Sequence, residues 1–321
     1  MTRDFGHVVG AALRDRGISI RAAAKEIHHH HSFLSRVIKG ERAPTPRMAE
    51  AIDALVGAHG AIAAMVLPEE DAARVEHHVS HPSRVDEKTV KSLAANLAAQ
   101  RDLDDHISAW AMIGPTESYL KWLEPMLRNA RGKQRDPLAE VVAEWIQFSG
   151  WLHAEARIDA PAVRRLSESA RLSREIESGP LLAQATAFQG WLCRQQGDFS
   201  AAVGWFLSAH ETKGAHPAQR MEHAVQAAQA YASLGDRDAA MRLLDKGQSI
   251  EDEARASQAP GTAYWLTPNF QRLNFGLVYT TLGEMSTAAD LLRTSLAELP
   301  AGHREAEWCR EYRDALILAT A

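Results

Sequence analysis

The chain has 321 residues, of which 45% are hydrophobic and 24% charged, a composition typical of a globular protein with a sizeable core. The longest apolar runs, such as residues 58–67, are too short and too interrupted to span a bilayer. The first residues lack the apolar stretch of a secretory signal, so we expect a cytoplasmic protein without a membrane segment.

The net charge of −5 is unevenly distributed along the chain. Residues 1–66 contain nine Lys or Arg and six Asp or Glu, a balance of +3 that leaves −8 for the remainder. A basic head on an acidic body favours a nucleic-acid contact confined to the head. Cys193 and Cys309 form no CxxC pair, and we expect small buried side chains rather than ligands or nucleophiles.

Residues 18–40 read ISIRAAAKEIHHHHSFLSRVIKG and predict two short helices, 20–27 and 31–38, joined by about three residues. Ala24 is small where the helices must approach closely, and Gly40 is placed to end the second helix. Inward-facing apolar residues are expected to form a small core: Phe5, Val9, Leu13, Ile27, Leu34, Val37, Met48, Ile52 and Leu55. In such a helix-turn-helix, one helix braces against the DNA backbone and the other offers its polar face to base edges.

This segment resembles the XRE (phage-repressor-like) helix-turn-helix family, whose pattern reads close to LTQEELAEKLGVSQSTISRIENGKRxPS. Residues 18–40 align with that pattern without a gap. Ser19 falls on the Thr that caps the first of the two helices, and residues 35–37 fall on Ser-Arg-Ile. Residues 40–45 fall on Gly-Lys-Arg-x-Pro-Ser.

Two positions depart from the family pattern. Ile20 replaces a Gln that often contacts phosphate, and His28 replaces the turn Gly. His28 must therefore adopt a left-handed or similar backbone conformation, which His tolerates less well than Gly.

The resemblance implies which residues would contact double-stranded DNA. The base-facing candidates are His31, Ser32, Ser35 and Arg36, and the phosphate candidates are Arg21, Lys25, Lys39 and Arg42. Arg36 is the strongest of these, because a guanidinium can bind guanine O6 and N7 together. The alternative for these charges is a solvated helix face.

The run His28 to His31 raises the question of a metal site. Consecutive histidines cannot all face one ion, and no Cys or acidic cluster completes a tetrahedral set, so we predict neither a metal nor another cofactor. An effect of pH on DNA affinity is better supported, because His gains charge near neutral pH. A metal site is likewise not expected at His77, His78 and His81.

Residues 67–87 are polar, contain two prolines and lack a sustained apolar stripe, which predicts a linker or a loosely held connecting helix. Helical patterns then continue to the end, with no strand pattern. They predict helices over 88–100, 102–113 and 115–131, with breaks at Gly114-Pro115, 132–137, Gly179-Pro180 and 214–217.

Two decapeptides, GWLHAEARID from Gly150 and GWLCRQQGDF from Gly190, share Gly-Trp-Leu and a following acidic turn. Further Gly-acidic turns follow at 235–236 and 283–284. Successive units of this series are 40, 38 and 48 residues apart. A small residue, an aromatic three positions on and a Gly turn resemble tetratricopeptide (TPR) repeats. The predicted fold class is all-α: a helix-turn-helix domain at 1–66 and a TPR-like α-solenoid for sensing or dimerisation at 88–321.

The combination resembles actinobacterial XRE regulators with C-terminal TPR-like arrays and, in plan, the peptide-sensing regulators of quorum-sensing Gram-positive bacteria. It implies transcription regulation, a homodimer and an effector, either a peptide, a small molecule or a protein. In TPR arrays the first helix of each pair lines the concave face. The residues placed there are Gln147, Trp151, Glu155, Trp191, Arg194, Gln195, Gln226, Gln229 and Asn274.

These positions have a second interpretation, in which the tryptophans pack between helices and the glutamines are solvated. The leading functional hypothesis is a sequence-specific DNA-binding regulator that reads its operator with residues 31–38. The alternative is an adaptor or scaffold whose helix-turn-helix makes only protein contacts. An enzyme is not indicated, because the sequence has no G-x-S-x-G, P-loop, H-E-x-x-H or G-x-G-x-x-G motif.

Overall fold

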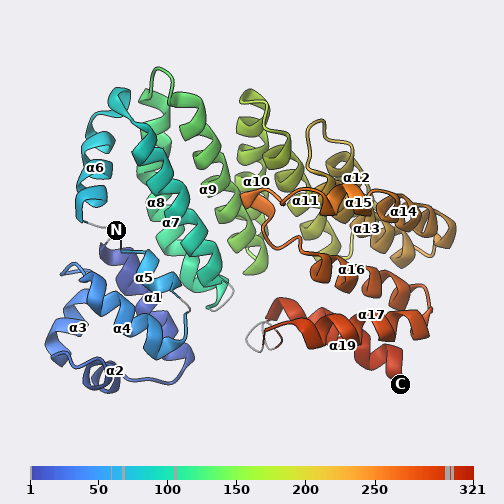
Figure 1. The fold of residues 1–321 in the computed structure, drawn as a ribbon, viewed down its shortest axis with the longest axis horizontal. Coiled ribbons are helices and arrows are strands. Elements are labelled where there is room, and N and C mark those ends of the chain that lie inside the picture. The colour runs from blue at the N-terminus through green and yellow to red at the C-terminus, as the bar shows by residue number, and fades with distance from the viewer. Residues whose placement is uncertain (1, 59, 67–68, 105–106, 301–303, 305–306) are drawn as a thin grey trace. The chain divides into compact units, whose positions relative to one another are not determined.

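The computed structural model describes residues 2–58, 60–66, 69–104, 107–300, 304 and 307–321, and within these ranges it is helical with no strand (Figure 1). By its internal contacts the chain divides into two compact units, Met1–Arg165 and Leu166–Ala321. The predicted fold class is confirmed: the protein is all-α, with a helix-turn-helix head and a TPR-like body of helical repeats.

The head consists of α1 (Thr2–Asp15), α2 (Ile20–Glu26), α3 (His31–Ile38), α4 (Pro46–Val56) and α5 (Ala61–Ala64). Local signals set the ends of these helices. Ser19 Oγ accepts the Ala22 amide at 3.2 Å and caps α2, and a left-handed Gly57 ends α4. The predicted core residues are buried, except that Leu55 is half-buried.

The residues predicted as a linker form α6 (Glu69–Ser80) and a short 3-10 helix, η1 (Pro82–Arg84), while 67 and 68 lie outside the described residues. Arg74 is ion-paired with Asp86 at 2.8 Å, and Nδ1 of the buried His78 lies 2.6 Å from Thr89 Oγ1. Burial lowers the pKa of His78, which favours its neutral form. These contacts fasten α6 to the start of the next helix, and the boundaries at 66 and 87 remain predictions.

The predicted break at Gly114-Pro115 is wrong. Two long helices, α7 (Glu87–Asp104) and α8 (Ala109–Asn129), replace the three expected, and Pro115 lies buried inside α8. A Pro inside a helix costs about 3 kcal/mol in propensity. Packing outweighs this penalty, since Tyr119 of α8 is buried and stacks on Trp145 of α9 (Arg135–Glu155) with ring centroids 4.6 Å apart.

After α10 (Asp159–Glu175), the second unit contains helix pairs in sequence: α11 (Gly179–Gln195) with α12 (Phe199–His210), α13 (Pro217–Ser233) with α14 (Arg237–Ser249), and α16 (Pro268–Thr281) with α17 (Met285–Glu298). A left-handed glycine links the helices of each pair: Gly197, Gly235 and Gly283, with φ of 77°, 80° and 80°. The Gly turns predicted from the sequence are confirmed.

Glycines also allow the paired helices to approach closely. A Cβ at Gly190 of α11 would lie 3.0 Å from the Phe206 ring of α12. A Cβ at Gly276 of α16 would lie 2.7 Å from Leu292 of α17. These crossings follow the repeat pattern, in which a small residue on one helix receives a large apolar side chain from its partner.

The spacing of 48 residues reflects an insertion between α14 and α16. It contains α15 (Glu251–Arg255) and the 3-10 helix η2 (Gly261–Ala263) and packs on the second unit through Trp265, which stacks on Phe188 with ring centroids 5.8 Å apart. The chain ends with η3 (Glu307–Cys309) and α19 (Arg310–Thr320). Cys309 is buried and Cys193 half-buried, both as free thiols.

Candidate functional site

The turn between α2 and α3 has the geometry that its sequence requires. His28 adopts φ 55°, the left-handed conformation expected where the family has Gly. His30 is the N-cap residue of α3, and its Nδ1 accepts the Ser32 amide at 3.3 Å and lies 2.7 Å from Ser32 Oγ. Because Nδ1 must be an acceptor for this amide, the capping form of His30 is an imidazole without a proton on Nδ1.

Removing this cap gives a first prediction. His30→Ala should destabilise the first turn of α3 by about 1 kcal/mol, which speeds amide exchange there by about fivefold. His30→Asn supplies another capping acceptor and should keep exchange near the wild-type rate. Hydrogen exchange followed by mass spectrometry on peptides from α3 measures this, and equal rates in all three proteins would contradict the cap.

The two faces of α3 differ in environment. Leu34 and Val37 are fully buried in the head, whereas His31, Ser32 and Arg36 are exposed. The fourth base-facing candidate, Ser35, is half-buried. The structure therefore brings the four predicted residues together on the outward face of one helix.

The four phosphate candidates are all exposed, on α2 and around the end of α3: Arg21, Lys25, Lys39 and Arg42. Arg42 is held by a stack that the sequence did not reveal. Its guanidinium carbon lies 4.6 Å from the centre of the Phe33 ring, and Phe33 stacks on His29 with ring centroids 5.7 Å apart. This cation–π contact orients the Arg42 side chain beside the outward face of α3.

The predicted effector residues of the first unit lie on α9. The expected exposure of Gln147 is wrong, because only 1% of it is accessible to solvent. Trp151 is half-buried and donates its Nε1 hydrogen to Asp104 Oδ2 at 3.0 Å, and Glu155 is also half-buried. Packing inside the first unit therefore explains the burial of Gln147 and the partial burial of Trp151.

The other predicted effector residues lie in the second unit, on α11, α13 and α16. Trp191 and Arg194 are half-buried, and Gln195 is exposed. Trp191 packs against the apolar cluster around Phe206. Gln229 is half-buried, whereas the expected exposure of Gln226 and Asn274 is wrong, at 9% and 2%.

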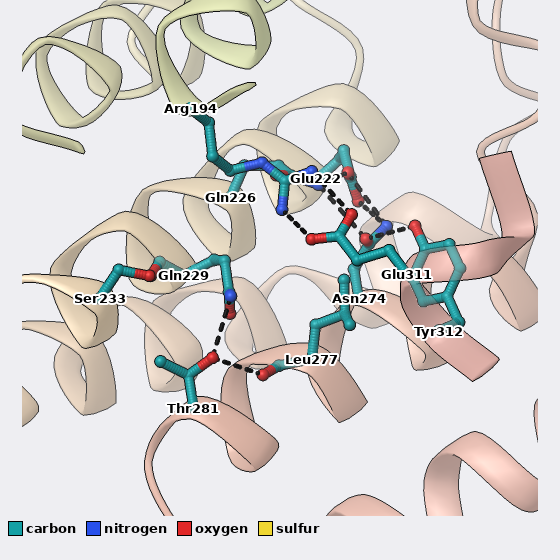
Figure 2. A network of polar contacts seen from close by, with 10 residues as sticks. All are labelled: Arg194, Glu222, Gln226, Gln229, Ser233, Asn274, Leu277, Thr281, Glu311 and Tyr312. Atoms are coloured by element: carbon teal, nitrogen blue, oxygen red, sulfur yellow. Dashed lines mark hydrogen bonds and ion pairs between the residues drawn. The ribbon is translucent and has the colours of Figure 1, made fainter. Parts of the chain in front are cut away.

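These buried amides belong to a polar network on helices α11, α13, α16 and α19, shown in Figure 2, which we call the repeat-face cluster: Arg194, Glu222, Gln226, Asn274, Glu311 and Tyr312. Glu222 Oε1 accepts from Gln226 Nε2 at 2.8 Å, and Asn274 Nδ2 donates to both Glu222 oxygens at 3.1 Å. Tyr312 donates its hydroxyl hydrogen to Asn274 Oδ1 at 2.8 Å.

A salt bridge joins α11 to α19. Arg194 Nη1 and Nη2 lie 2.8 and 3.2 Å from the two carboxylate oxygens of Glu311, a bidentate arrangement. The Arg194 side chain is 8% exposed and that of Glu311 is 45% exposed. The pair therefore lies at the solvent edge of the cluster.

Glu222 is the electrostatic centre of the cluster. Burial raises its pKa from the usual 4.5 to about 7, against the opposing effects of the Gln226 amide, Arg194 and Asn274. Burial also raises the pKa of Tyr312, so this phenol stays a donor. No sequence pattern indicates Glu222, Glu311 or Tyr312 as site residues, because a polar side chain on an amphipathic helix looks solvated until a neighbouring helix covers it.

Two further properties bear on function. Among the described residues, no group of three His, Cys, Asp or Glu is placed to hold a metal ion. Within the same residues, no helix combines the length and the apolar character needed to cross a membrane.

The left-handed turn at His28, the exposed face of α3 and the helix pairs of the second unit define a helix-turn-helix domain followed by helical repeats. Residues 11–57 match the model of the helix-turn-helix family. The XRE-type helix-turn-helix inferred from residues 18–40 is thereby confirmed.

No curated protein matches the sequence. A solved structure entitled "Crystal Structure of Rap Protein Complexed with Competence and Sporulation Factor" is similar over 97% of both chains, with 14% sequence identity and a TM-score of 0.38.

Proposed function

We propose that this protein is a sequence-specific DNA-binding transcriptional regulator that reads its operator by placing α3 in the major groove. The observation that carries the proposal is the division of α3 into a buried apolar face and an exposed face with His31, Ser32 and Arg36. The balance of +3 in residues 1–66 supports it, because contact with phosphate needs a basic surface.

The proposal includes a homodimer in the cytoplasm. One α3 can contact only a few base pairs, whereas two copies on a palindromic operator multiply the specificity. In this scheme the helix-turn-helix domain is 1–66, the linker 67–87 and the repeat domain 88–321. The repeat domain responds to an effector, either a peptide, a small molecule or a protein.

The position of the effector site rests on the predicted residues that the structure leaves accessible or at the solvent edge. Arg194, Gln195 and Gln229 meet this description in the second unit. Amide and guanidinium groups on such a face can form hydrogen bonds to a peptide backbone or to a polar small molecule. The buried Gln226 and Asn274 would support these residues from behind.

The second candidate function is a protein adaptor with a helix-turn-helix that does not bind DNA. One observation favours it: Ile20 stands where the family has a phosphate-contacting Gln. A gel-shift titration of the full chain against fragmented genomic DNA separates the two. The regulator hypothesis requires DNA binding that weakens steeply as the salt concentration increases. If the chain shows no such binding, the result supports the adaptor hypothesis.

Replacement of Arg36 and replacement of Arg42 should change DNA binding in different ways. Arg36→Ala should lose roughly 1–3 kcal/mol at one base pair and relax the preference there, because it removes a base contact. Arg42→Ala should weaken binding to all sequences alike and reduce the salt dependence by about one ion. Binding-site selection followed by sequencing measures both, and uniform losses for both variants would contradict the assigned roles.

A further inference from the structure

We propose that the repeat-face cluster binds a primary ammonium group of the effector, which pairs with Glu222. This inference deepens the proposed function, on which it rests, by assigning a chemical class to the ligand of the repeat domain.

Glu222 is a buried carboxylate without a cation in contact. Among the described residues it forms no ion pair, and its donors are the neutral amides of Gln226 and Asn274. Arg194 lies close enough to influence Glu222, but its Nη groups bind Glu311. A buried charge is normally paired, since desolvation is otherwise uncompensated. Within the described part of the chain, Glu222 therefore has no cation in direct contact with its carboxylate.

The buried polar atoms around Glu222 that have no hydrogen-bond partner in the described part of the chain are mainly acceptors. Gln226 donates to Glu222, yet its own buried Oε1 meets no donor in the described part of the chain. Gln229 Oε1, one turn further along α13, is in the same condition, while Arg194 Nε is a single unpaired donor. An ammonium group has three donors and no acceptor, which suits a site with surplus oxygens.

The charge balance points the same way. Arg194 on α11 is the charged group that acts on Glu222, and Arg194 is in turn paired with Glu311 on α19. Tyr312 on α19 adds a neutral phenol. Two carboxylates and one guanidinium leave a single negative charge when Glu222 is ionised. An ammonium group would neutralise it. Its route is at the solvent edge, where the Glu311 side chain is 45% exposed.

A linked proton makes the proposal measurable. With a pKa of about 7, Glu222 is half protonated at neutral pH in the free protein. A bound cation stabilises the carboxylate, so binding at pH 7 should release about half a proton. For the same reason affinity for an ammonium probe should increase about tenfold between pH 6 and pH 8, over which the amine stays protonated.

The test uses the full chain and three probes of similar size: n-butylammonium, 1-butanol and butyrate. Ligand-observed NMR gives the affinities at pH 6, 7 and 8. Calorimetry in two buffers of different ionisation enthalpy gives the proton release. We expect butylammonium to bind best, with the pH dependence given above. Glu222→Gln should lose that preference and release no proton.

Glu211→Gln is the matched control, because it removes an exposed carboxylate from the same unit. It should behave as wild type. Circular dichroism verifies that each variant is folded.

A comparison of spermidine with a blocked tripeptide that has a central Lys identifies the source of the ammonium group. Tighter binding of spermidine indicates a free polyamine, and tighter binding of the tripeptide indicates a peptide.

Several results would overturn the proposal. They are equal binding of butanol, tighter binding of butyrate, no binding by any of the amines, or unchanged proton release in Glu222→Gln. Because the assay contains no DNA, its outcome is independent of the gel shift that tests the helix-turn-helix. Failure of one does not imply failure of the other.

Discussion

Gly6→Ala is expected to destabilise the head by about 3 kcal/mol and to abolish DNA binding at concentrations where the wild type is saturated. A Cβ at Gly6 of α1 would lie 2.3 Å from the Ile38 carbonyl oxygen and 2.6 Å from that of Val37. Both are backbone atoms at the end of α3. No rotamer change relieves such a contact, so α3 itself must move away from α1.

Gly10→Ala is the matched control, one turn further along the same helix. Its Cβ would lie 3.4 Å from Ile38 Cγ2 and from Arg14 Nη1, distances that a slight shift of flexible side chains accommodates. Since Ala favours a helix over Gly by about 1 kcal/mol, this variant should be neutral or slightly more stable. Urea denaturation of both variants, followed by gel shift, measures the difference. Equal destabilisation by the two would contradict the close contact at Gly6.

Glu222→Gln is expected to be more stable than the wild type by about 3 kcal/mol at pH 8, with the difference vanishing near pH 4. In the folded wild type the pKa of Glu222 is raised by burial to about 7, from 4.5. Between these values the folded state holds a proton that the unfolded chain has lost, so wild-type stability falls as pH rises. Gln cannot ionise, and the variant lacks that fall.

The control for this experiment is Glu117→Gln in the first unit, where the sign is opposite. Burial acts to raise the pKa of Glu117, but hydrogen bonds from Arg165 and Ser149 outweigh it and lower the pKa. Its carboxylate stabilises the folded state at neutral pH, and that contribution is lost as pH falls. Glu117→Gln should therefore be less stable at pH 7, with the difference shrinking in acid. Urea midpoints from pH 4 to 8 test both variants, and parallel profiles would contradict the assignment.

The head could be predicted closely from the sequence because its determinants are local. The helix limits follow from the Ser19 cap, the turn and the inward spacing of Leu34 and Val37, and α3 has the predicted bounds. The left-handed His28 followed from the absence of Gly at a turn that needs positive φ. In the repeats, the Gly turns were equally local signals.

The remaining features depend on contacts between residues far apart in the chain. Pro115 signals a helix break by itself, and only packing around Tyr119 and Trp145 keeps α8 continuous. The burial of Gln226 and Asn274 required the neighbouring helices to be in place. Glu222 has no sequence signal for the same reason, and its network includes Tyr312 of α19, 90 positions further along the chain (312 − 222).

The bridge between Arg194 and Glu311 links residues separated by 117 positions. An engineered version of the protein that lacks α19 would therefore lose contacts within the repeat-face cluster. Shortening the chain before Arg310 would remove both Glu311 and Tyr312, strip a donor from Asn274 and admit water to a carboxylate that is otherwise shielded. Affinity tags and fluorescent fusions that follow α19 should for this reason be joined through a spacer, with the last turn of this helix left intact.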